Sequence, residues 1–292
     1  MGQFLQQLIN GLSLGSIYAL VALGYTMVYG IIKLINFAHG DVYMIGAYTA
    51  FFVTTYMGMS FLPALLVCMI VCGILGVLIE RIAYRPLRNA PRITALITAI
   101  GVSYVIEYTT QFFMGTTTRT YPAMLPNKSW QLGPVRISYL QMVIFSVTIV
   151  LMILLTLVIQ KTKIGRAMRA VSADEDAARL MGISVDNTIS FTFLIGSALA
   201  GAAGMLVGLY YNAATPLMGM VPGLKAFVAA VFGGIGSIPG ALVGGLFIGI
   251  AESMVVAYGS SLYRDAIVYA ILIIVLIVRP TGLFGKNERE KV

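Results

Sequence analysis

Polar and charged side chains interrupt several long apolar runs of this sequence, and these residues are the ones that could do chemistry. Glu107 lies inside the run Ile93 to Met114, and Asn36, His39 and Asp41 lie in a polar break between two other runs. A carboxylate inside a membrane span must face protein or water, so by default it marks a transport path or a proton relay. A polar break lies either at the membrane boundary or along a cavity. These residues therefore predict a path for a small polar solute.

Two of the carboxylates also have purely structural interpretations. Glu107 could be neutralised by a proton or hydrogen-bonded by Tyr104 or Tyr108. Glu252 and Lys225 flank a proline- and glycine-rich region, where they could form an ion pair or be two separate interfacial residues.

Other kinds of chemistry find no support in the residue pattern. Cys68 and Cys72 lie one helical turn apart in an apolar run and are interpreted as small buried hydrophobes, far from the single histidine. The Walker A pattern GxxxxGK[ST] is absent, and neither a nucleophile nor a paired-carboxylate spacing stands out. The sequence therefore predicts no enzyme, no metal site and no cofactor bound by this chain. The net charge of +8 comes from basic residues between the apolar runs, where they report topology rather than nucleic acid binding.

The most charged segment, GRAMRAVSADEDAARLMG, runs from Gly165 to Gly182. Ser172 and Glu175 have the spacing of a capping box, which predicts a helix beginning at Ala173. Gly182 is placed to end this helix with a positive φ. The first turn carries acidic residues, which the positive end of the helix dipole favours: Asp174, Glu175 and Asp176.

This short helix is expected to have one apolar face and one ion pair. Ala177, Leu180 and Met181 share a face, whereas Glu175 and Arg179 have the favourable i, i+4 spacing. A helix of about two turns is too short to be stable alone, so it needs a partner. Its apolar face either enters a groove on another protein or lies on the membrane domain of its own chain.

Long apolar runs determine the fold class. With 292 residues, 59% of them hydrophobic, and a mean hydropathy of +0.92, the chain is predicted to be an all-α polytopic membrane protein. We expect one transmembrane domain over residues 1–292, with about nine spans (eight to ten), broken helices and the N-terminus outside. The predicted spans include Leu8 to Ile32, Val42 to Met57, Pro63 to Ile79, Ile93 to Met114, Ile137 to Ile159, Ile189 to Tyr211, Val221 to Ile235 and Leu262 to Val278.

Basic residues and glycines predict how these spans are arranged. Lys and Arg cluster after the third and fifth spans, so the segment 161–187 is expected in the cytoplasm and the loop 115–136 outside. The prolines and glycines between residues 215 and 245 are typical of broken helices that line a pathway. Gly204 and Gly208, four residues apart, favour close approach between two helices.

Four segments in order carry a resemblance to a known family: GYTMVYGIIKLINFAHGDVYMIGAY, ERIAYRPLR, GRAMRAVSADEDAARLMGI and LKAFVAAVFGGIGSIPGALVGGL. Together they resemble the LivH-type permease of bacterial branched-chain amino acid ABC importers over nearly the whole chain. The resemblance implies the ABC importer permease fold and a location in the bacterial cytoplasmic membrane. It also implies three kinds of partner: a second homologous permease subunit, two cytoplasmic ABC ATPase subunits that use ATP, and an extracytoplasmic binding protein that delivers Leu, Ile or Val.

Within that family the cytoplasmic helix implies a contact with the ATPases. Glu175, Ala177, Ala178 and Gly182 match the glutamate, alanines and glycine of the contacting loop, whereas Asp176 adds an acid that such loops usually lack. The expected ATPase-coupling residues are Ser172, Asp174, Glu175, Asp176, Ala177, Ala178, Arg179, Leu180, Met181 and Gly182. The expected residues of the substrate path are Asn36, His39, Asp41, Glu107 and Glu252.

Two other functions remain open at this stage. A related ABC permease for urea or short amides would have a similar sequence. An ion-coupled secondary amino acid transporter would use Glu107 or Glu252 as its coupling carboxylate. The cytoplasmic helix favours an ABC permease, because a secondary carrier has no need of it.

Overall fold

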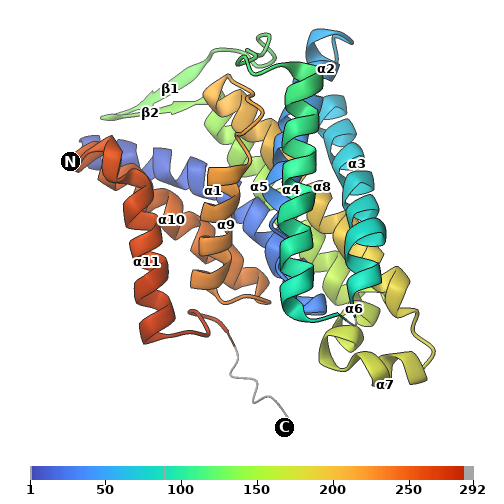
Figure 1. Cartoon of the computed structure of the whole chain (residues 1–292). Coiled ribbons are helices and arrows are strands. Elements are labelled where there is room, and N and C mark those ends of the chain that lie inside the picture. Colours follow the sequence, from blue (N-terminus) through green and yellow to red (C-terminus); the bar gives the residue numbers. More distant parts are fainter. Residues whose placement is uncertain (1, 89, 286–292) are drawn as a thin grey trace.

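The computed structural model describes residues 2–88 and 90–285 and is mainly helical (Figure 1). Its longer helices are α1 (Gly2–Ile32), α2 (His39–Thr55), α3 (Phe61–Ile79), α4 (Arg92–Met114), α5 (Tyr139–Lys161), α8 (Val185–Tyr211), α9 (Met220–Gly233), α10 (Ile238–Tyr258) and α11 (Arg264–Val278). Shorter elements are the π-helical turn η1 (Glu80–Tyr84), the 3₁₀ turns η2 (Arg85–Leu87) and η3 (Ser261–Tyr263), and the helices α6 (Lys163–Ala173) and α7 (Glu175–Leu180). Two antiparallel strands, β1 (Ser129–Leu132) and β2 (Val135–Ser138), form a hairpin.

The helices confirm a polytopic membrane protein. In the described part of the chain, seven helices are long and apolar enough to cross a membrane: α1, α3, α4, α5, α8, α10 and α11 with η3. The other two apolar helices are shorter, with 17 residues in α2 and 14 in α9. The predicted count of nine spans therefore depends on these two helices, and their length does not confirm it.

Helices α1 and α8 form the centre of the molecule. Helix α1 packs along α10, α8 and α9, and α8 packs against α3 and α2. Most of the apolar windows of α1 and α8 are buried, whereas α4, α5 and α11 are largely exposed. Glycines bring α1 and α10 together, because a Cβ on Gly11 would lie 2.6 Å from the Cα of Ile250.

The predicted close approach to a second helix is confirmed at Gly204, whereas Gly208 contacts a residue of the segment between α4 and β1. A Cβ on Gly204 would collide with the carbonyl oxygen of Tyr43 on α2, and one on Gly208 would collide with the ring of Tyr121. Small residues let membrane helices approach closely enough for dispersion contacts between their backbones. The glycine pattern of α8 therefore positions α2 against it.

The helical path is interrupted at two places inside the bundle, before α2 and before α9, and the sequence predicts both interruptions. Helix α1 ends at Ile32, and residues 33–38 are non-helical, with Lys33 at a φ of 54°. Helix α2 then begins at His39, which is buried against Gly24 in α1. The second short helix, α9, begins beside the first, since a Cβ on Gly40 would lie 2.6 Å from the carbonyl oxygen of Gly219.

The loops divide between two ends of the molecule. Helices α6 and α7 and the connection from α3 to α4 lie at one end, whereas the hairpin and the start of α1 lie at the other (Figure 1). Gln6 ties the start of α1 to the hairpin: its Nε2 donates to the Arg136 carbonyl (3.0 Å) and its Oε1 accepts from the Arg136 N–H (2.8 Å). The basic loops thus share one end and the N-terminus lies at the opposite end, in agreement with the predicted topology.

The predicted loop 115–136 is partly a hairpin, which the sequence reading missed. Trp130 pairs with Ile137 across the two strands, and Gly133 adopts a φ of 61° in the turn. Cross-strand pairing satisfies backbone groups that an irregular loop would leave to water. The fifth predicted span accordingly begins at Tyr139 rather than Ile137, after a capping box between Ser138 and Gln141.

Candidate functional site

The cytoplasmic helix predicted from Ser172 to Gly182 begins later than expected. Helix α6 continues to Ala173, and the Ser172 Oγ donates to the carbonyl oxygen of Gly30 in α1 (2.8 Å). The predicted capping box of Ser172 with Glu175 is therefore wrong, because that hydroxyl is already bonded to another helix. Asp174 leaves helical geometry (φ −160°, ψ 112°) and caps α7 by accepting from the Ala177 N–H at 2.9 Å.

The C-terminal end of α7 is as predicted. Gly182 has a φ of 81°, the Gly182 N–H donates to the Arg179 carbonyl (3.1 Å), and the Ile183 N–H donates to the Ala178 carbonyl (3.0 Å). This pair of bonds is a Schellman motif, which satisfies the last carbonyls of a helix. The predicted ion pair of Glu175 with Arg179 is also present at 3.0 Å, and its exposure makes its contribution to stability small.

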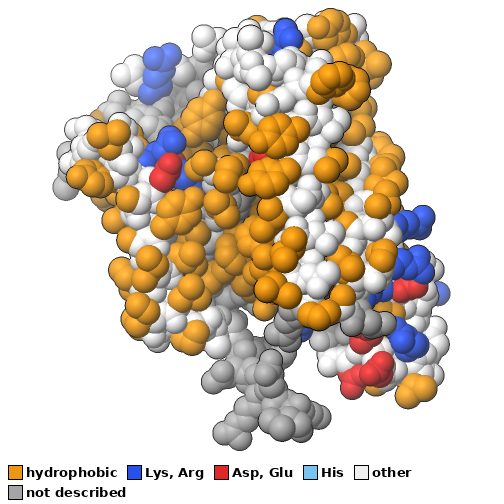
Figure 2. Space-filling view, viewed as in Figure 1, with side chains coloured by type: hydrophobic (Ala, Val, Ile, Leu, Met, Phe, Trp, Pro, Cys, Tyr) orange, Lys and Arg blue, Asp and Glu red, His pale blue; other side chains and the backbone are white. Residues whose placement is uncertain are grey.

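Helix α7 projects from one end of the molecule (Figure 1). Leu180 is 88% exposed and Met181 is 83% exposed, and Ala177 is exposed as well. Ala178 is the buried residue of this helix. Figure 2 shows charged side chains gathered over the α6 and α7 end, whereas hydrophobic side chains cover much of the surface between the two ends. The apolar face is thus uncovered in a region otherwise rich in charge.

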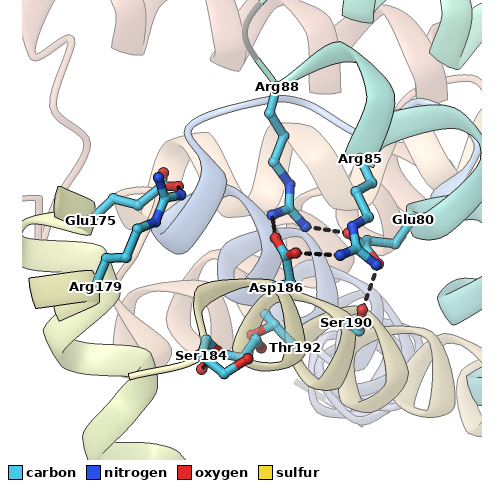
Figure 3. Close-up of polar contacts among 10 residues, drawn as sticks. Glu80, Arg85, Arg88, Glu175, Arg179, Ser184, Asp186, Ser190 and Thr192 are labelled. Carbon is cyan, nitrogen blue, oxygen red and sulfur yellow. Dashed lines mark hydrogen bonds and ion pairs between the residues drawn. The ribbon is translucent and has the colours of Figure 1, made fainter. Parts of the chain in front are cut away.

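A cluster of ion pairs lies close to α7 and joins two parts of the chain (Figure 3). The Arg88 guanidinium contacts both Glu80 and Asp186, and Arg85 contacts Asp186 too. The Ser190 Oγ donates to the other oxygen of Glu80 at 2.6 Å. The cluster fixes η1 and η2 to the first turns of α8.

Sequence reasoning did not single out Glu80 or Asp186. Glu80 is completely buried, and breaking a buried ion pair by removing one partner typically costs about 3–5 kcal/mol. An acidic residue at the end of an apolar run, just before a group of arginines, was the signal available for Glu80. Its hydroxyl partner Ser190 lies 110 residues further along the sequence, and Asp186 joins the cluster only through Arg85 and Arg88, so no local spacing links these residues.

Two of the predicted path residues meet between α2 and α4. The Ser103 Oγ donates to the Asp41 carboxylate, and the carboxyl groups of Asp41 and Glu107 lie close enough to interact electrostatically. Tyr104 and Tyr108 are instead more than half exposed on the outer surface of α4. The interpretation of Glu107 as a partner of those tyrosines is therefore wrong, since its partner is Asp41.

Glu252 lies in a second buried cluster, where the ion-pair interpretation is confirmed. The Lys225 Nζ lies 3.0 Å from Glu252 and 2.6 Å from Asp265, and both Lys225 and Glu252 are about 1% exposed. The Tyr18 hydroxyl donates to Glu252 at 2.9 Å, and Arg264 adds a contact at 3.3 Å. This cluster joins α1, α9, α10 and α11.

Asn36 and His39 are buried near the break before α2. The Tyr84 hydroxyl donates to the Asn36 Oδ1 at 3.2 Å. The His39 ring packs edge-on against Tyr25, with 4.6 Å between ring centroids. The five predicted path residues are thus all buried, but they form separate clusters rather than one lining: Asp41 lies near Glu107, the His39 N–H donates to the Asn36 carbonyl (3.1 Å), and Glu252 lies apart in the Lys225 cluster.

Among residues 2–88 and 90–285, no group of three or more His, Cys, Asp and Glu side chains gathers to hold a metal ion. Cys68 and Cys72 are buried free thiols on α3, as the sequence predicts.

Comparison with known proteins gives consistent matches over the whole chain. The family model described as the permease component of the branched-chain amino acid transport system matches residues 7–276. The chain is 46% identical to the high-affinity branched-chain amino acid transport system permease protein BraD of Pseudomonas aeruginosa, over 99% of this chain and 98% of BraD. It is equally similar to LivH of Escherichia coli K12, a permease protein of the same description, with the same coverage. A probable LivH of Methanocaldococcus jannaschii is 31% identical over 94% of this chain and 90% of its own length.

Proposed function

Because the chain belongs to the family of branched-chain amino acid transport permeases, we propose that it is the transmembrane subunit of an ATP-driven importer for Leu, Ile and Val in the bacterial cytoplasmic membrane. In this proposal it pairs with a second homologous permease subunit. Two cytoplasmic ATPase subunits hydrolyse ATP, and an extracytoplasmic binding protein delivers the amino acid. The substrate class comes from the names of the BraD and LivH relatives.

The observation that carries the proposal is the exposed apolar face of α7. Leu180 and Met181, at the end of α7, are both more than four-fifths exposed. Burying a Leu or Met side chain contributes roughly 1.5–3 kcal/mol. A groove on an ATPase that covers both residues would gain that free energy, and residues 2–88 and 90–285 of this chain leave them exposed.

Two contacts would transmit a movement of α7 to the membrane helices. On one side, Ser172 bonds α6 to Gly30 at the end of α1. On the other side, the Arg88 cluster fixes the start of α8 to η1 at the end of α3. ATPase closure that displaces α7 would therefore act on α1, α3 and α8 together and convert the path from inward- to outward-facing.

The buried polar residues are proposed to line that path. A zwitterionic amino acid needs polar partners for its ammonium and carboxylate groups, and space for its apolar side chain. Asp41 on α2 and Glu107 on α4 are buried side chains, and Asn36 and His39 lie at the break where α2 begins. If selectivity resides in the binding protein, their substitution lowers the transport rate more than the apparent affinity.

Leucine uptake tests the proposal directly. The proteoliposomes contain this chain with its partner permease, ATPases and binding protein. Uptake is measured with ATP trapped inside them and, separately, with an imposed ion gradient in place of ATP. Uptake should require ATP and the binding protein, and should fall in Glu175→Lys and Gly182→Asp. The second variant acts through backbone strain at φ 81°, because no atom lies within 4 Å of its Cβ position.

The neighbouring carboxyl groups of Asp41 and Glu107 support a second candidate function. Two neighbouring buried carboxyl groups could bind and release a proton, which an ion-coupled carrier would translocate. Uptake that follows the ion gradient without ATP, that ignores both α7 variants and that disappears in Glu107→Gln would overturn the ABC importer in favour of this carrier. Uptake of urea or short amides in place of leucine would identify the related permease class.

A further inference from the structure

A cleft of about 220 Å³ opens at the cytoplasmic end between α1, α6 and the turn from α9 to α10. Its apolar wall includes Met27, Ile31 and Ile238, and its polar groups are Thr26, Arg169 and Ser172. The volume is below the roughly 300–1,000 Å³ typical of sites for drug-sized ligands. It therefore suits a ligand the size of an amino acid.

The Thr26 hydroxyl has an unused hydrogen-bonding capacity. Thr26 is 2% exposed, and its Oγ1 has no partner among the described residues. Hydroxyls on helices of this chain commonly donate to the carbonyl four residues earlier, as in Ser13, Ser16, Thr54, Thr110, Thr156, Thr188 and Thr192. Thr26 does not, and a buried hydroxyl left without a bond is unfavourable. Thr26 lines the cleft, so a rotation of its side chain would turn the hydroxyl toward a ligand that supplies the missing bond.

Arg169 and Ser172 provide opposite hydrogen-bonding groups in the same cleft: Arg169 is a cationic donor and Ser172 is an acceptor. Within the described part of the chain, the Arg169 guanidinium donates to the Ile159 carbonyl and forms no ion pair with a carboxylate. It can therefore bind an anion, because a guanidinium has five N–H donors. The proton of the Ser172 hydroxyl is already used on the Gly30 carbonyl, so its oxygen has only lone pairs to offer a second partner.

We propose that this cleft is a cytoplasmic site for a small zwitterion with an apolar side chain, a branched-chain amino acid such as leucine. Arg169 and Thr26 bind the carboxylate, the Ser172 oxygen accepts from the ammonium, and the apolar wall covers the side chain. The identity of the amino acid rests on the proposed function, whereas the cleft and its polar groups do not.

Occupancy of the site would regulate transport. The ligand lies between α1 and α6, and α6 leads directly through Asp174 into α7. An amino acid in the cleft would hold α6 against α1 and oppose the movement that ATPase closure requires. Leucine accumulated in the cytoplasm would then slow its own import.

Binding to the full chain in nanodiscs of neutral lipid is the first test, with labelled leucine as the probe. Thr26→Val keeps the shape of the side chain and removes the hydroxyl, and it should weaken binding about tenfold or more, as expected for a hydrogen bond to a charged group. Thr148→Val is the matched control, because Thr148 is also buried on a membrane helix without a partner but does not line the cleft. Its binding should equal that of the wild type.

Several results would overturn the site. These are the absence of saturable leucine binding, equal binding by wild type and Thr26→Val, and an equal loss in Thr148→Val. Thermal unfolding of each variant shows whether the substitution has simply damaged the fold. Phosphatidylglycerol that displaces leucine or binds in its place would assign the cleft to a lipid headgroup instead.

Transport separates this inference from the proposed function. In vesicles preloaded with leucine, ATP-driven uptake should slow for the wild type and for Thr148→Val, and should stay fast for Thr26→Val. ATP-driven uptake that internal leucine never slows would refute the regulatory site alone. Failure of ATP to drive any uptake would refute the importer itself.

Discussion

Substitution of Leu180 by Ala gives the most direct measure of how α7 contacts an ATPase. The side chain is 88% exposed in this chain, so a groove that covers it removes almost all of its surface from water. The substitution removes the equivalent of three methylene groups at about 0.8 kcal/mol each, or about 2 kcal/mol after scaling to the exposed fraction. The ATPase should therefore bind roughly 30-fold more weakly.

The assay is the equilibrium binding of the purified ATPase to this chain with its partner permease in nanodiscs. Leu262→Ala is a matched control, because Leu262 is also 88% exposed but lies on η3, at the end of the molecule opposite α7. We expect no change in this control. Equal affinity of Leu180→Ala and wild type would refute the docking of α7, and an equal loss in Leu262→Ala would show that the effect does not arise at the proposed contact.

Three further outcomes can be measured by thermal unfolding or uptake. Gly204→Ala should lower the unfolding temperature, because its Cβ would collide with the α2 backbone, whereas Gly101→Ala, with nothing within 4 Å, should be neutral or slightly stabilising. Lys225→Met leaves Glu252 buried without its lysine and should destabilise the chain by about 3–5 kcal/mol, and Glu252→Leu added to it should recover part of that loss. Gly182→Asn should retain more uptake than Gly182→Val, because Asn tolerates a positive φ and a β-branched residue does not.

Features that depend on local sequence could be predicted well. The apolar runs set the positions of the helices, and the glycines of α8 identified a close helix contact. The positive φ at Gly182 and the ion pair of Glu175 with Arg179 both follow from spacing within one or two turns.

The errors concern partners that are distant in sequence. Ser172 has the spacing of a helix cap, but its hydroxyl bonds Gly30, which is 142 residues away. Glu80 finds Ser190 at a separation of 110 residues, so the cluster at the start of α8 has no local signature. The sequence shows that a carboxylate lies inside a span, which is unusual. Only the three-dimensional structure shows that Glu107 lies near Asp41 rather than a tyrosine.

The contact between Tyr18 and Glu252 has a consequence for biosynthesis. The two residues are separated by 234 positions, so Tyr18 enters the membrane long before its partner is made. At roughly 5–20 residues per second, the ribosome needs roughly 10–50 s to cover that distance. During this interval the central helix has no α10 to pack against and its buried hydroxyl has no acceptor from that helix. The bundle therefore assembles largely after its helices have entered the membrane. Until α10 is inserted, another contact has to cover the buried surface of α1.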